Sequence, residues 1–460
     1  MPPKKRQLSL TSFTKNNKRQ ETGNNNSIEN KDSYPGSWFE SHNLLIGKFG
    51  DPQTSSKIAA FDLDGTLINV KSKYKTPQDG DDWVFAFPIV VDKLRKLYSE
   101  GFHISLVSNQ KGLLVEKGKK DLKKQKRIQD MKHKLQIPFW FFAAKEEDFF
   151  RKPRIGIWYL VAIHANKGEK IDLDSSFYVG DALGRPAGWR QGVSKDHSDC
   201  DLKLAYNIGI KIYSPEEFFE SKIKPPKIVD PVHPRDLTSL ISEKKKEYDG
   251  YENDLIENIN QAKKDNKQVV VIMIGMPASG KSTFVLDTLV EKCGFTRVNQ
   301  DTLVTKKKCL DFAAQSLKEG KNIVIDNTNP GPDPRSEFIS LAKSFNTLIY
   351  CAHKDVPDQV VSHNNSFRAV YKQAIAIDNW VKFESSYCYP NPDLINKPLE
   401  ELVELVPDPG NKVSRIVYNV YKNKFVLPTK NEGFHGIYLI PFSANNNSDL
   451  ESKIWNLHLS

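Results

Sequence analysis

Short apolar runs alternate with amphipathic stretches along much of the chain. Four runs have the continuous apolar character of strands that are buried on both faces of a parallel sheet: Ile58–Phe61, Ile104–Val107, Ser176–Val179 and Ile210–Tyr213. Two stretches between them, Asp92–Tyr98 and Ile155–His164, have helical spacing. This strand–helix alternation predicts a doubly wound α/β domain at residues 51–221.

A second α/β pattern follows a connector. Residues 222–266 contain four prolines and then a charged run with helical character at 240–264. Strand-like runs return at Val269–Ile274, Asn322–Ile325 and Thr347–Tyr350. We therefore expect two doubly wound α/β domains, with a linker and connecting helix at 222–266 and the second domain at 267–460.

Residues 1–50 are polar and of low complexity, which predicts a disordered tail. The basic run Lys4-Lys5-Arg6 resembles a nuclear localisation signal, so we expect a nuclear protein. The next residues resemble the box that docks on DNA sliding clamps, with Gln7, Leu10 and Phe13 at its key places and Thr14 where a second aromatic is usual. A chance apolar patch in a polar tail is the alternative interpretation.

The positive charge of the chain is concentrated in two segments. The sequence has 67 Lys and Arg against 57 Asp and Glu, a formal net charge of +10. Residues 1–20 hold six basic and no acidic residues, and residues 111–134 hold ten basic and three acidic ones. The other 416 residues have a net charge of −3. These segments favour an acidic partner such as nucleic acid, although a solvated charged face is the alternative for either one.

Several classes of protein are disfavoured. No apolar run approaches the ~18 residues of a transmembrane helix, and the basic amino terminus lacks the apolar core of a secretory signal. The five cysteines are scattered without a CxxC pair, which favours a reducing compartment over a disulfide framework or a structural zinc site. We expect a monomer without a membrane partner.

The first candidate site is Asp62 and Asp64, at the end of the first predicted strand. Ligands of open α/β sheets bind beyond the carboxyl ends of the strands. Two carboxylates at this spacing can converge on one phosphate and one metal ion, so that one attacks phosphorus and the other handles protons. A helix-capping Asp followed by a turn Gly would account for one of the two carboxylates but not for both.

Further polar residues follow the other strands of this domain. Ser108 and Asn109 close the second strand, where their side chains can hold phosphate oxygens. Lys152 can neutralise the phosphoryl group, and Asp181 can hold Mg²⁺ with a hard oxygen ligand. The pattern resembles the haloacid-dehalogenase-like phosphatases. The resemblance implies that Asp62 forms an aspartyl-phosphate, that Asp64 is the general acid and base, and that the metal ligands are Asp62, Asp64 and Asp181.

The second candidate site is the segment Gly275–Ser282, which matches the P-loop pattern G-x-x-x-x-G-K-[ST] after a predicted strand. The backbone N–H groups of such a loop cradle phosphates, while Lys281 reaches the β/γ-phosphates and the Ser282 hydroxyl meets Mg²⁺. The expected ATP-binding residues are Gly275, Pro277, Ser279, Gly280, Lys281, Ser282, Thr283 and Arg368.

A P-loop alone does not separate an ATPase from a kinase. Asp301 follows about twenty residues after the loop, where its carboxylate can accept the proton of an attacking hydroxyl. Asp326 ends a further strand as a Walker-B-like carboxylate. Arg335 and Arg368 are candidates for stabilising the transferred phosphoryl group, although each arginine taken alone is more often a surface residue.

A phosphatase followed by a P-loop kinase on one basic chain resembles the eukaryotic polynucleotide kinase 3′-phosphatases, over about residues 35–460. The segments Gly180–Ala187, Asp326–Pro330 and His363–Asn365 are also similar to that family. The resemblance implies Mg²⁺-dependent removal of 3′-phosphates from DNA and ATP-dependent phosphorylation of 5′-hydroxyls, with Asp301 as general base. It also implies DNA ends as the substrate. The expected substrate-binding residues are Asn109, Arg185, Asp326 and Arg335.

Two residues depart from the family pattern, since Gln300 and Ser366 stand where the family usually has arginine. Residues 1–50 are also too short and polar for the phosphopeptide-binding domain of the animal members. Two alternatives therefore stay open. One is a DNA 3′-phosphatase whose kinase half is weak or only binds nucleotide or DNA. The other is a small-molecule kinase and phosphatase pair, which the clustered basic segments disfavour.

Overall fold

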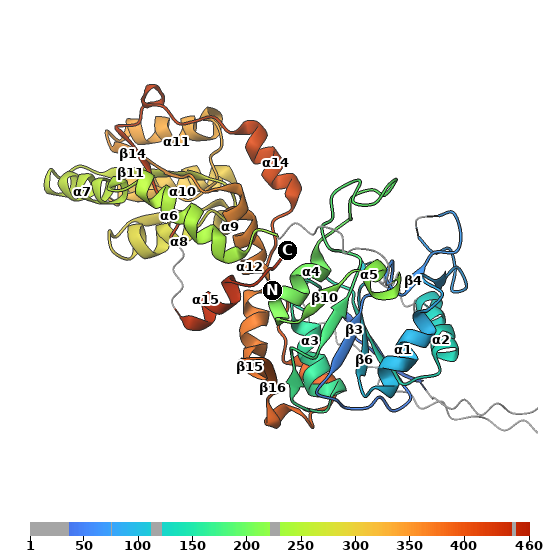
Figure 1. The fold of residues 1–460 in the computed structure, drawn as a ribbon. Coiled ribbons are helices and arrows are strands. Elements are labelled where there is room, and N and C mark those ends of the chain that lie inside the picture. The colour runs from blue at the N-terminus through green and yellow to red at the C-terminus, as the bar shows by residue number, and fades with distance from the viewer. Residues whose placement is uncertain (1–35, 75, 112–121, 221–230, 444–447) are drawn as a thin grey trace, which may run out of the picture. The chain divides into compact units, whose positions relative to one another are not determined.

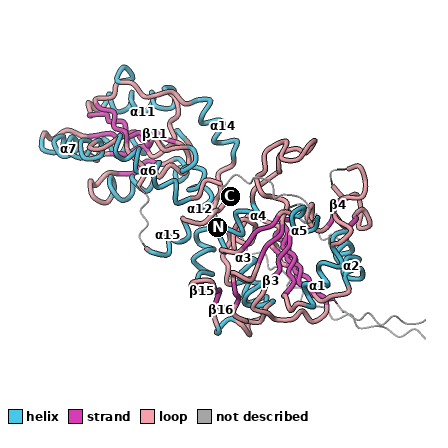
Figure 2. Tube along the Cα trace, in the orientation of Figure 1, coloured by secondary structure: helices cyan, strands magenta, loops and turns pink. Residues whose placement is uncertain are grey.

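The computed structural model describes residues 36–460 except 75, 112–121, 221–230 and 444–447. The expected nuclear signal and clamp-binding box therefore lie outside the described residues. The described chain forms two compact units. The first comprises the described residues up to 231 together with 370–410 and 457–460, and the second comprises 232–369 and 411–456. Each unit has its own sheet with helices around it (Figure 1, Figure 2).

The first unit is built on a seven-stranded sheet in the order β1-β2-β7-β6-β3-β9-β10. The strands are β1 Gly36–Glu40, β2 Leu44–Phe49, β3 Ile58–Phe61, β6 His103–Asn109, β7 Phe139–Ala144, β9 Phe177–Val179 and β10 Lys211–Tyr213. All neighbouring pairs from β7 to β10 are parallel, whereas β1 and β2 form an antiparallel edge. The chain proceeds from β3 toward β7 on one side and from β9 to β10 on the other. The strand order thus reverses beside β3, which is where ligands of doubly wound sheets bind.

Helices and two small sheets complete the first unit. The helices are α1 Val90–Ser99, α2 Leu122–Leu135, α3 Gly156–Leu160 with the π-helical turn η2 Val161–Ala165, α4 Cys200–Ile208, α5 Pro215–Glu220 and α13 Leu399–Glu404, together with the end of α12 Asp358–Ile377. The small sheets pair β4 Ile68–Asn69 with β5 Val84–Phe85, and join β8 Ile171–Asp172, β15 Val381–Glu384 and β16 Tyr387–Pro390. Apolar side chains of α1 and α2, including Leu94 and Ile128, pack with Ile104 and Phe139 of the sheet. The predicted doubly wound fold is confirmed.

The second unit has a five-stranded parallel sheet in the order β12-β13-β11-β14-β17. The strands are β11 Val269–Gly275, β12 Thr296–Val298, β13 Ile323–Ile325, β14 Leu348–Lys354 and β17 Gly436–Leu439. Its longer helices are α6 Leu237–Glu247, α7 Tyr251–Lys264, α8 Lys281–Phe284 with η4 Val285–Val290, α10 Lys306–Lys318, α11 Pro332–Ser344, α12 Asp358–Ile377, α14 Arg415–Lys424 and α15 Asp449–Trp455. Alternate residues of β11 enter two different apolar clusters, which identifies a sheet covered on both faces.

Three expected boundaries differ from those in the structure. Residues 36–50 are not part of a disordered tail, because β1 and β2 lie there and bury Phe39, Leu44 and Phe49 against the sheet. The connecting run is not a separate linker, because α6 and α7 belong to the second unit, with a break at Gly250 (φ 87°). Residues 370–410, expected in the kinase domain, fall in the first unit because β16 pairs with β8. The unit boundary lies within α12.

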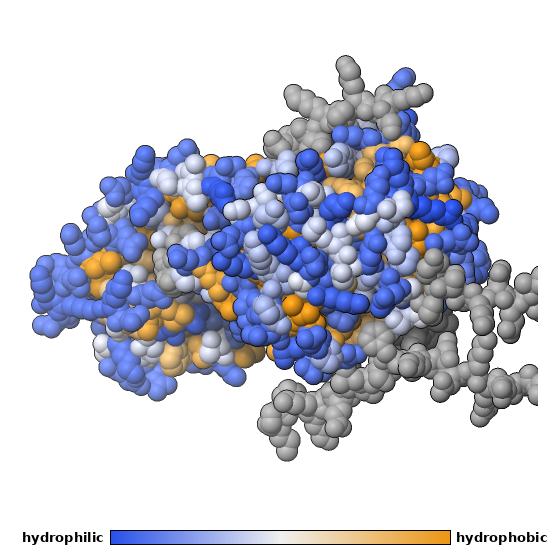
Figure 3. Space-filling model, turned by 60° about the horizontal axis from the view of Figure 1, so that its bottom comes forward, coloured by the Kyte–Doolittle hydropathy of each residue, from blue (hydrophilic) through white to orange (hydrophobic). Residues whose placement is uncertain are grey.

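The face drawn in Figure 3 is mostly hydrophilic, with hydrophobic residues scattered among the polar ones. None of the helices in the described part of the chain has the length and apolarity that crossing a bilayer requires.

Candidate active sites

The first site is centred on Asp62, which follows β3 directly and is 7% exposed. Its Oδ1 lies 2.6 Å from the Nζ of Lys152, and the same Nζ lies 2.8 Å from Oδ1 of Asp201. Lys152 also donates to the backbone oxygen of Val107 (3.0 Å) and to the hydroxyl of Tyr178 (2.9 Å). Burial by itself lowers the pKa of Lys152, but the carboxylates of Asp201 and Asp62 outweigh it and hold that pKa well above its usual value. Lys152 is therefore a fixed cation beside Asp62.

Three carboxylates converge at this point. Oxygen atoms of Asp62, Asp181 and Asp201 all lie within 4.8 Å of one another. Burial and the charge of Asp201 raise the pKa of Asp181 to about 7, and burial raises the pKa of Asp62 well above its usual value. Gly65, at φ 86°, permits this approach, because a Cβ there would lie 2.6 Å from Oδ2 of Asp181. Crowded hard oxygen ligands of this kind fit Mg²⁺.

Asp64 has a different environment from Asp62, with 46% of its side chain exposed. Its Oδ2 accepts a hydrogen bond from Nε2 of Gln110 (2.6 Å), and its Oδ1 lies 3.4 Å from the guanidinium of Arg127. The same Gln110 nitrogen lies 2.6 Å from the hydroxyl of Ser108, which is 2% exposed. Asp64 is thus oriented by a neutral amide and a cation while it stays accessible to solvent protons.

Asn109 and Arg185, expected to bind substrate, contact other parts of the protein. Asn109 Oδ1 accepts from the backbone N–H of Lys152 and its Nδ2 donates to the Lys152 backbone oxygen, both at 3.0 Å. Arg185 is buried, forms ion pairs with Asp196 (2.8 Å) and Glu216 (2.9 Å), and donates to the backbone oxygen of Asp181 (3.0 Å). In this structure, both side chains support the loops that carry Lys152 and Asp181.

The basic segment 111–134 is only partly described, since residues 112–121 lie outside the described part. Of the rest, Arg127 is buried and pairs with Asp64, and Lys126 pairs with Asp81. Arg127 therefore contacts a candidate catalytic residue, whereas a role of the lysines of this segment in DNA binding stays a prediction.

The second site is the P-loop between β11 and α8. Ala278 and Gly280 both have positive φ angles, of 60° and 84°, which turns successive backbone N–H groups toward one side. Lys281 is buried and donates to the backbone oxygens of Gly275 (2.9 Å) and Met276 (2.7 Å). Among the described residues, the buried hydroxyl of Ser279 has no hydrogen-bond partner. An anion bound in this loop could accept a hydrogen bond from the Ser279 hydroxyl.

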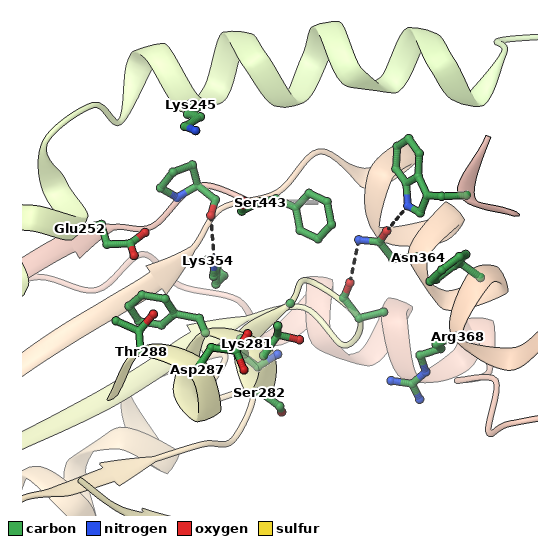
Figure 4. Close-up of a pocket in the computed structure, with 18 of the residues that line it drawn as sticks. Lys245, Glu252, Lys281, Ser282, Asp287, Thr288, Lys354, Asn364, Arg368 and Ser443 are labelled. Atoms are coloured by element: carbon green, nitrogen blue, oxygen red, sulfur yellow. Dashed lines mark hydrogen bonds between the residues drawn. The ribbon is translucent and has the colours of Figure 1, made fainter. Parts of the chain in front are cut away.

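A cavity of about 670 Å³ lies beside the P-loop (Figure 4). Its lining includes Gly280, Lys281, Ser282, Thr283 and Arg368 from the expected nucleotide site, together with Lys354, Phe367, Phe442 and Trp455. Cations and hydroxyls stand beside aromatic rings, so the lining fits the phosphates and the base of a nucleotide such as ATP. Pro277 lies in the same loop but does not line the described part of the cavity.

Asp301 is held in place by its neighbours. It lies on the short helix α9 Gln300–Leu303, whose first turn is capped by Oδ1 of Asn299, 3.2 Å from the N–H of Thr302. Asn327 accepts the N–H of Gln300 at 3.0 Å. Burial lowers the pKa of Lys281 to about 8, and the charge of Asp301 partly opposes this shift. The structure thus brings Asp301 within electrostatic range of the P-loop lysine.

The other predicted residues of the second site differ in their surroundings. Asp326 is buried, pairs with Arg297 through Nε (2.8 Å) and acts electrostatically on Lys281. Arg368 is exposed and lines the cavity. Arg335 is fully buried, forms an ion pair with Glu432 (2.8 Å), and is not one of the described residues that line the cavity. Arg368 rather than Arg335 is placed to meet a nucleotide.

Three functional residues were not anticipated. Asp201 comes from α4, Gln110 follows β6, and Arg127 comes from α2, so each joins the first site from a separate element. The sequence offers no motif at a fixed spacing from Asp62 for Asp201 or Arg127. Gln110 directly follows Ser108-Asn109, and this adjacency was the available signal.

Comparisons with known proteins agree with both sites. Residues 57–219 match the model of the polynucleotide kinase 3 phosphatase family, and residues 270–380 match an AAA domain. A bifunctional polynucleotide phosphatase/kinase of Schizosaccharomyces pombe is 33% identical, over 95% of this chain and 94% of that protein. A relative from Acanthamoeba polyphaga mimivirus is 32% identical, over 88% of this chain and 90% of its own length. The polynucleotide 3′-phosphatase ZDP of Arabidopsis thaliana is 34% identical over 36% of this chain and 24% of that protein. The chain therefore belongs to the family of bifunctional polynucleotide phosphatase/kinases.

Proposed function

We propose that this protein heals DNA ends, removing 3′-phosphates at the first site and phosphorylating 5′-hydroxyls at the second. The 2.6 Å contact between Asp62 and Lys152 is the observation that carries the proposal. A buried carboxylate held against a fixed cation at the carboxyl edge of a sheet can attack phosphorus while the cation offsets the phosphoryl charge. The P-loop and its cavity on the same chain supply the second half.

The phosphatase reaction proceeds in two steps. An oxygen of Asp62 attacks phosphorus, the bond between phosphorus and the 3′-oxygen breaks, and Asp64 gives its proton to the leaving 3′-oxygen. Asp64 then takes a proton from water as the water oxygen attacks phosphorus. The bond between phosphorus and the Asp62 oxygen breaks, which restores the Asp62 carboxylate and releases inorganic phosphate. Lys152 stays beside Asp62 and offsets the charge of the phosphoryl group. The accessible position of Asp64 suits this exchange of protons with substrate and water.

Mg²⁺ held by Asp62, Asp181 and Asp201 would supply charge neutralisation for the phosphoryl group.

In the kinase reaction, Asp301 accepts the proton of the 5′-hydroxyl as the hydroxyl oxygen forms a bond to the γ-phosphorus of ATP. The bond between that phosphorus and the β–γ bridging oxygen breaks, and ADP leaves. Lys281 and Arg368 lie where they can neutralise phosphate charge.

The tail carries further proposals. We infer nuclear localisation from Lys4-Lys5-Arg6 and sliding-clamp docking from Gln7, Leu10 and Phe13. We also infer that the protein acts as a monomer.

The alternative of a kinase unit that only binds nucleotide is less well supported, because Lys281, Ser282 and Asp301 are all present and Asp301 acts electrostatically on Lys281.

The experiment uses the full chain and two oligonucleotides, one bearing only a 3′-phosphate and one only a 5′-hydroxyl, in single-stranded, nicked and recessed forms. We expect phosphate release from the first and transfer of γ-labelled phosphate to the second. Asp62→Asn should remove only the first activity. Phosphate release without transfer would favour a kinase unit that only binds nucleotide. The absence of both activities would overturn the proposal.

A further inference from the structure

We propose that residues 457–460 position the catalytic Lys152 for 3′-dephosphorylation. This inference rests on the proposed phosphatase function and adds a distant segment of the chain to that site. The four residues follow α15 and Asn456 of the second unit but belong to the first unit. His458 and Leu459 are 3% and 1% exposed, so the segment is packed into that unit. Figure 1 marks this end of the chain beside α4.

The backbone of the segment is held by three side chains. Asn207 binds His458 in both directions, because its Oδ1 accepts from the His458 N–H and its Nδ2 donates to the His458 oxygen, both at 2.8 Å. Arg154 donates from Nε to the oxygen of Leu459 (3.0 Å), and Lys203 donates to the oxygen of Ser460 (2.7 Å). These bonds involve backbone atoms of residues 458–460 and therefore depend on where the segment runs.

The same side chains hold the loop that carries Lys152. Asn207 Nδ2 also donates to the oxygen of Pro153 (2.9 Å), and Arg154 donates from its guanidinium to the oxygen of Asp148 (2.6 Å). Asn109 fixes the backbone of Lys152 itself from the other direction, through its N–H and its oxygen. The backbone at residues 152–153 is therefore held by Asn109 on Lys152 and by Asn207 on Pro153, and the bonds to His458 orient Asn207.

Residues 457–460 also join two elements whose side chains meet in the active site. Lys203 and Asn207 lie on α4, which carries Asp201. The Oδ1 of Asp201 lies 2.8 Å from the Nζ of Lys152. By linking α4 to the loop at 152–154, the segment fixes the distance over which this ion pair forms. Small displacements of catalytic groups are costly, since a shift of about 1 Å can lower a rate by about 100-fold.

Deletion of residues 457–460 from the full chain tests the inference. We expect kcat for 3′-phosphate removal to fall about tenfold, with KM changed less than about twofold. The 5′-kinase activity should stay within about twofold and reports that the second unit is folded. A phosphatase kcat within twofold of the unaltered chain would overturn the inference. If the unaltered chain itself lacks phosphatase activity, the proposed function fails instead.

Hydrogen exchange separates positioning from general destabilisation. In the deletion protein, amides of residues 148–156 should exchange faster while those of β3 and β6 keep their protection. Loss of protection across the whole unit, or no change at 148–156, would contradict a positioning role. His458→Pro removes the N–H that Asn207 accepts, whereas His458→Ala retains it. We therefore expect the larger loss of kcat from His458→Pro, and equal losses would argue against the backbone bond.

Discussion

The side-chain amide of Gln110 donates a hydrogen bond to the carboxylate of Asp64 over 2.6 Å. Because Asp64 is half exposed, this bond and the weaker contact with Arg127 set the direction of the carboxylate. General acid–base catalysis contributes about 10²–10⁴-fold to a rate and depends on hydrogen-bond geometry. We therefore expect Gln110, which lies outside the expected motifs, to position Asp64 for proton transfer.

Replacing this amide is the first test. Gln110→Ala should lower kcat for 3′-phosphate removal about tenfold, because Asp64 remains present but loses its orientation. Phosphate release from a 3′-phosphorylated oligonucleotide measures the effect. Gln129→Ala, at an exposed glutamine of α2, is the matched control and should keep the original rate. Equal rates for the two variants would remove Gln110 from the mechanism.

Magnesium affinity should depend on pH through Asp181. Its pKa is raised to about 7, so the carboxyl is mostly protonated at pH 6 and mostly ionised at pH 8. A proton on this ligand competes with the metal, and the affinity is therefore full above the pKa and lost as the pH falls through it. Calorimetric titration with Mg²⁺ alone should give a Kd about tenfold lower at pH 8 than at pH 6, with proton release near pH 7. In Asp181→Asn, a Kd ratio still near ten would contradict this assignment.

Removal of the P-loop lysine should separate the two activities. Lys281→Ala should reduce phosphate transfer to a 5′-hydroxyl oligonucleotide by at least about 1000-fold, since charge stabilisation of phosphoryl transfer is lost. Release of 3′-phosphate by the same protein should stay within about twofold. Lys318→Ala, at an exposed lysine of α10, serves as the control. Substantial transfer by Lys281→Ala would show that another site binds ATP.

Ser366 offers a test by stability. Its side chain is 1% exposed, and its hydroxyl has no hydrogen-bond partner among the described residues. Ser366→Ala should leave the free energy of unfolding within about 1 kcal/mol or raise it, because no satisfied bond is lost. Ser366→Arg, which restores the residue usual in the family, should cost more than about 2 kcal/mol, because it buries a charge. Denaturant unfolding of the second unit measures the change in free energy for both variants. An arginine variant as stable as the unaltered chain would mean that the side chain at position 366 reaches solvent.

The sequence was informative where function depends on neighbouring residues. Asp62 and Asp64 stand close together in the chain and follow an apolar run, and so do the residues of the P-loop. At each site, the motif and the strand before it were therefore predictable. β7 was not predicted although Phe139–Ala144 is wholly apolar, since a short apolar run does not by itself distinguish strand from helix. Asp201 could not be assigned either, because only the packing of α4 brings it to Lys152. Arg335 was expected at the phosphates, but it is fully buried and forms an ion pair with Glu432.

The order in which the chain is made gives the divided first unit a further meaning. A ribosome synthesises residues 457–460 only after all of residues 232–456, so the loop of Lys152 waits for the entire second unit before its last supports exist. A product cut short by premature termination would contain every motif of the phosphatase without those supports. A gene fragment that ends at residue 221 would lack them as well, together with the strand that pairs with β8. When the two halves are expressed from separate genes, we therefore expect the kinase half to keep more of its activity than the phosphatase half.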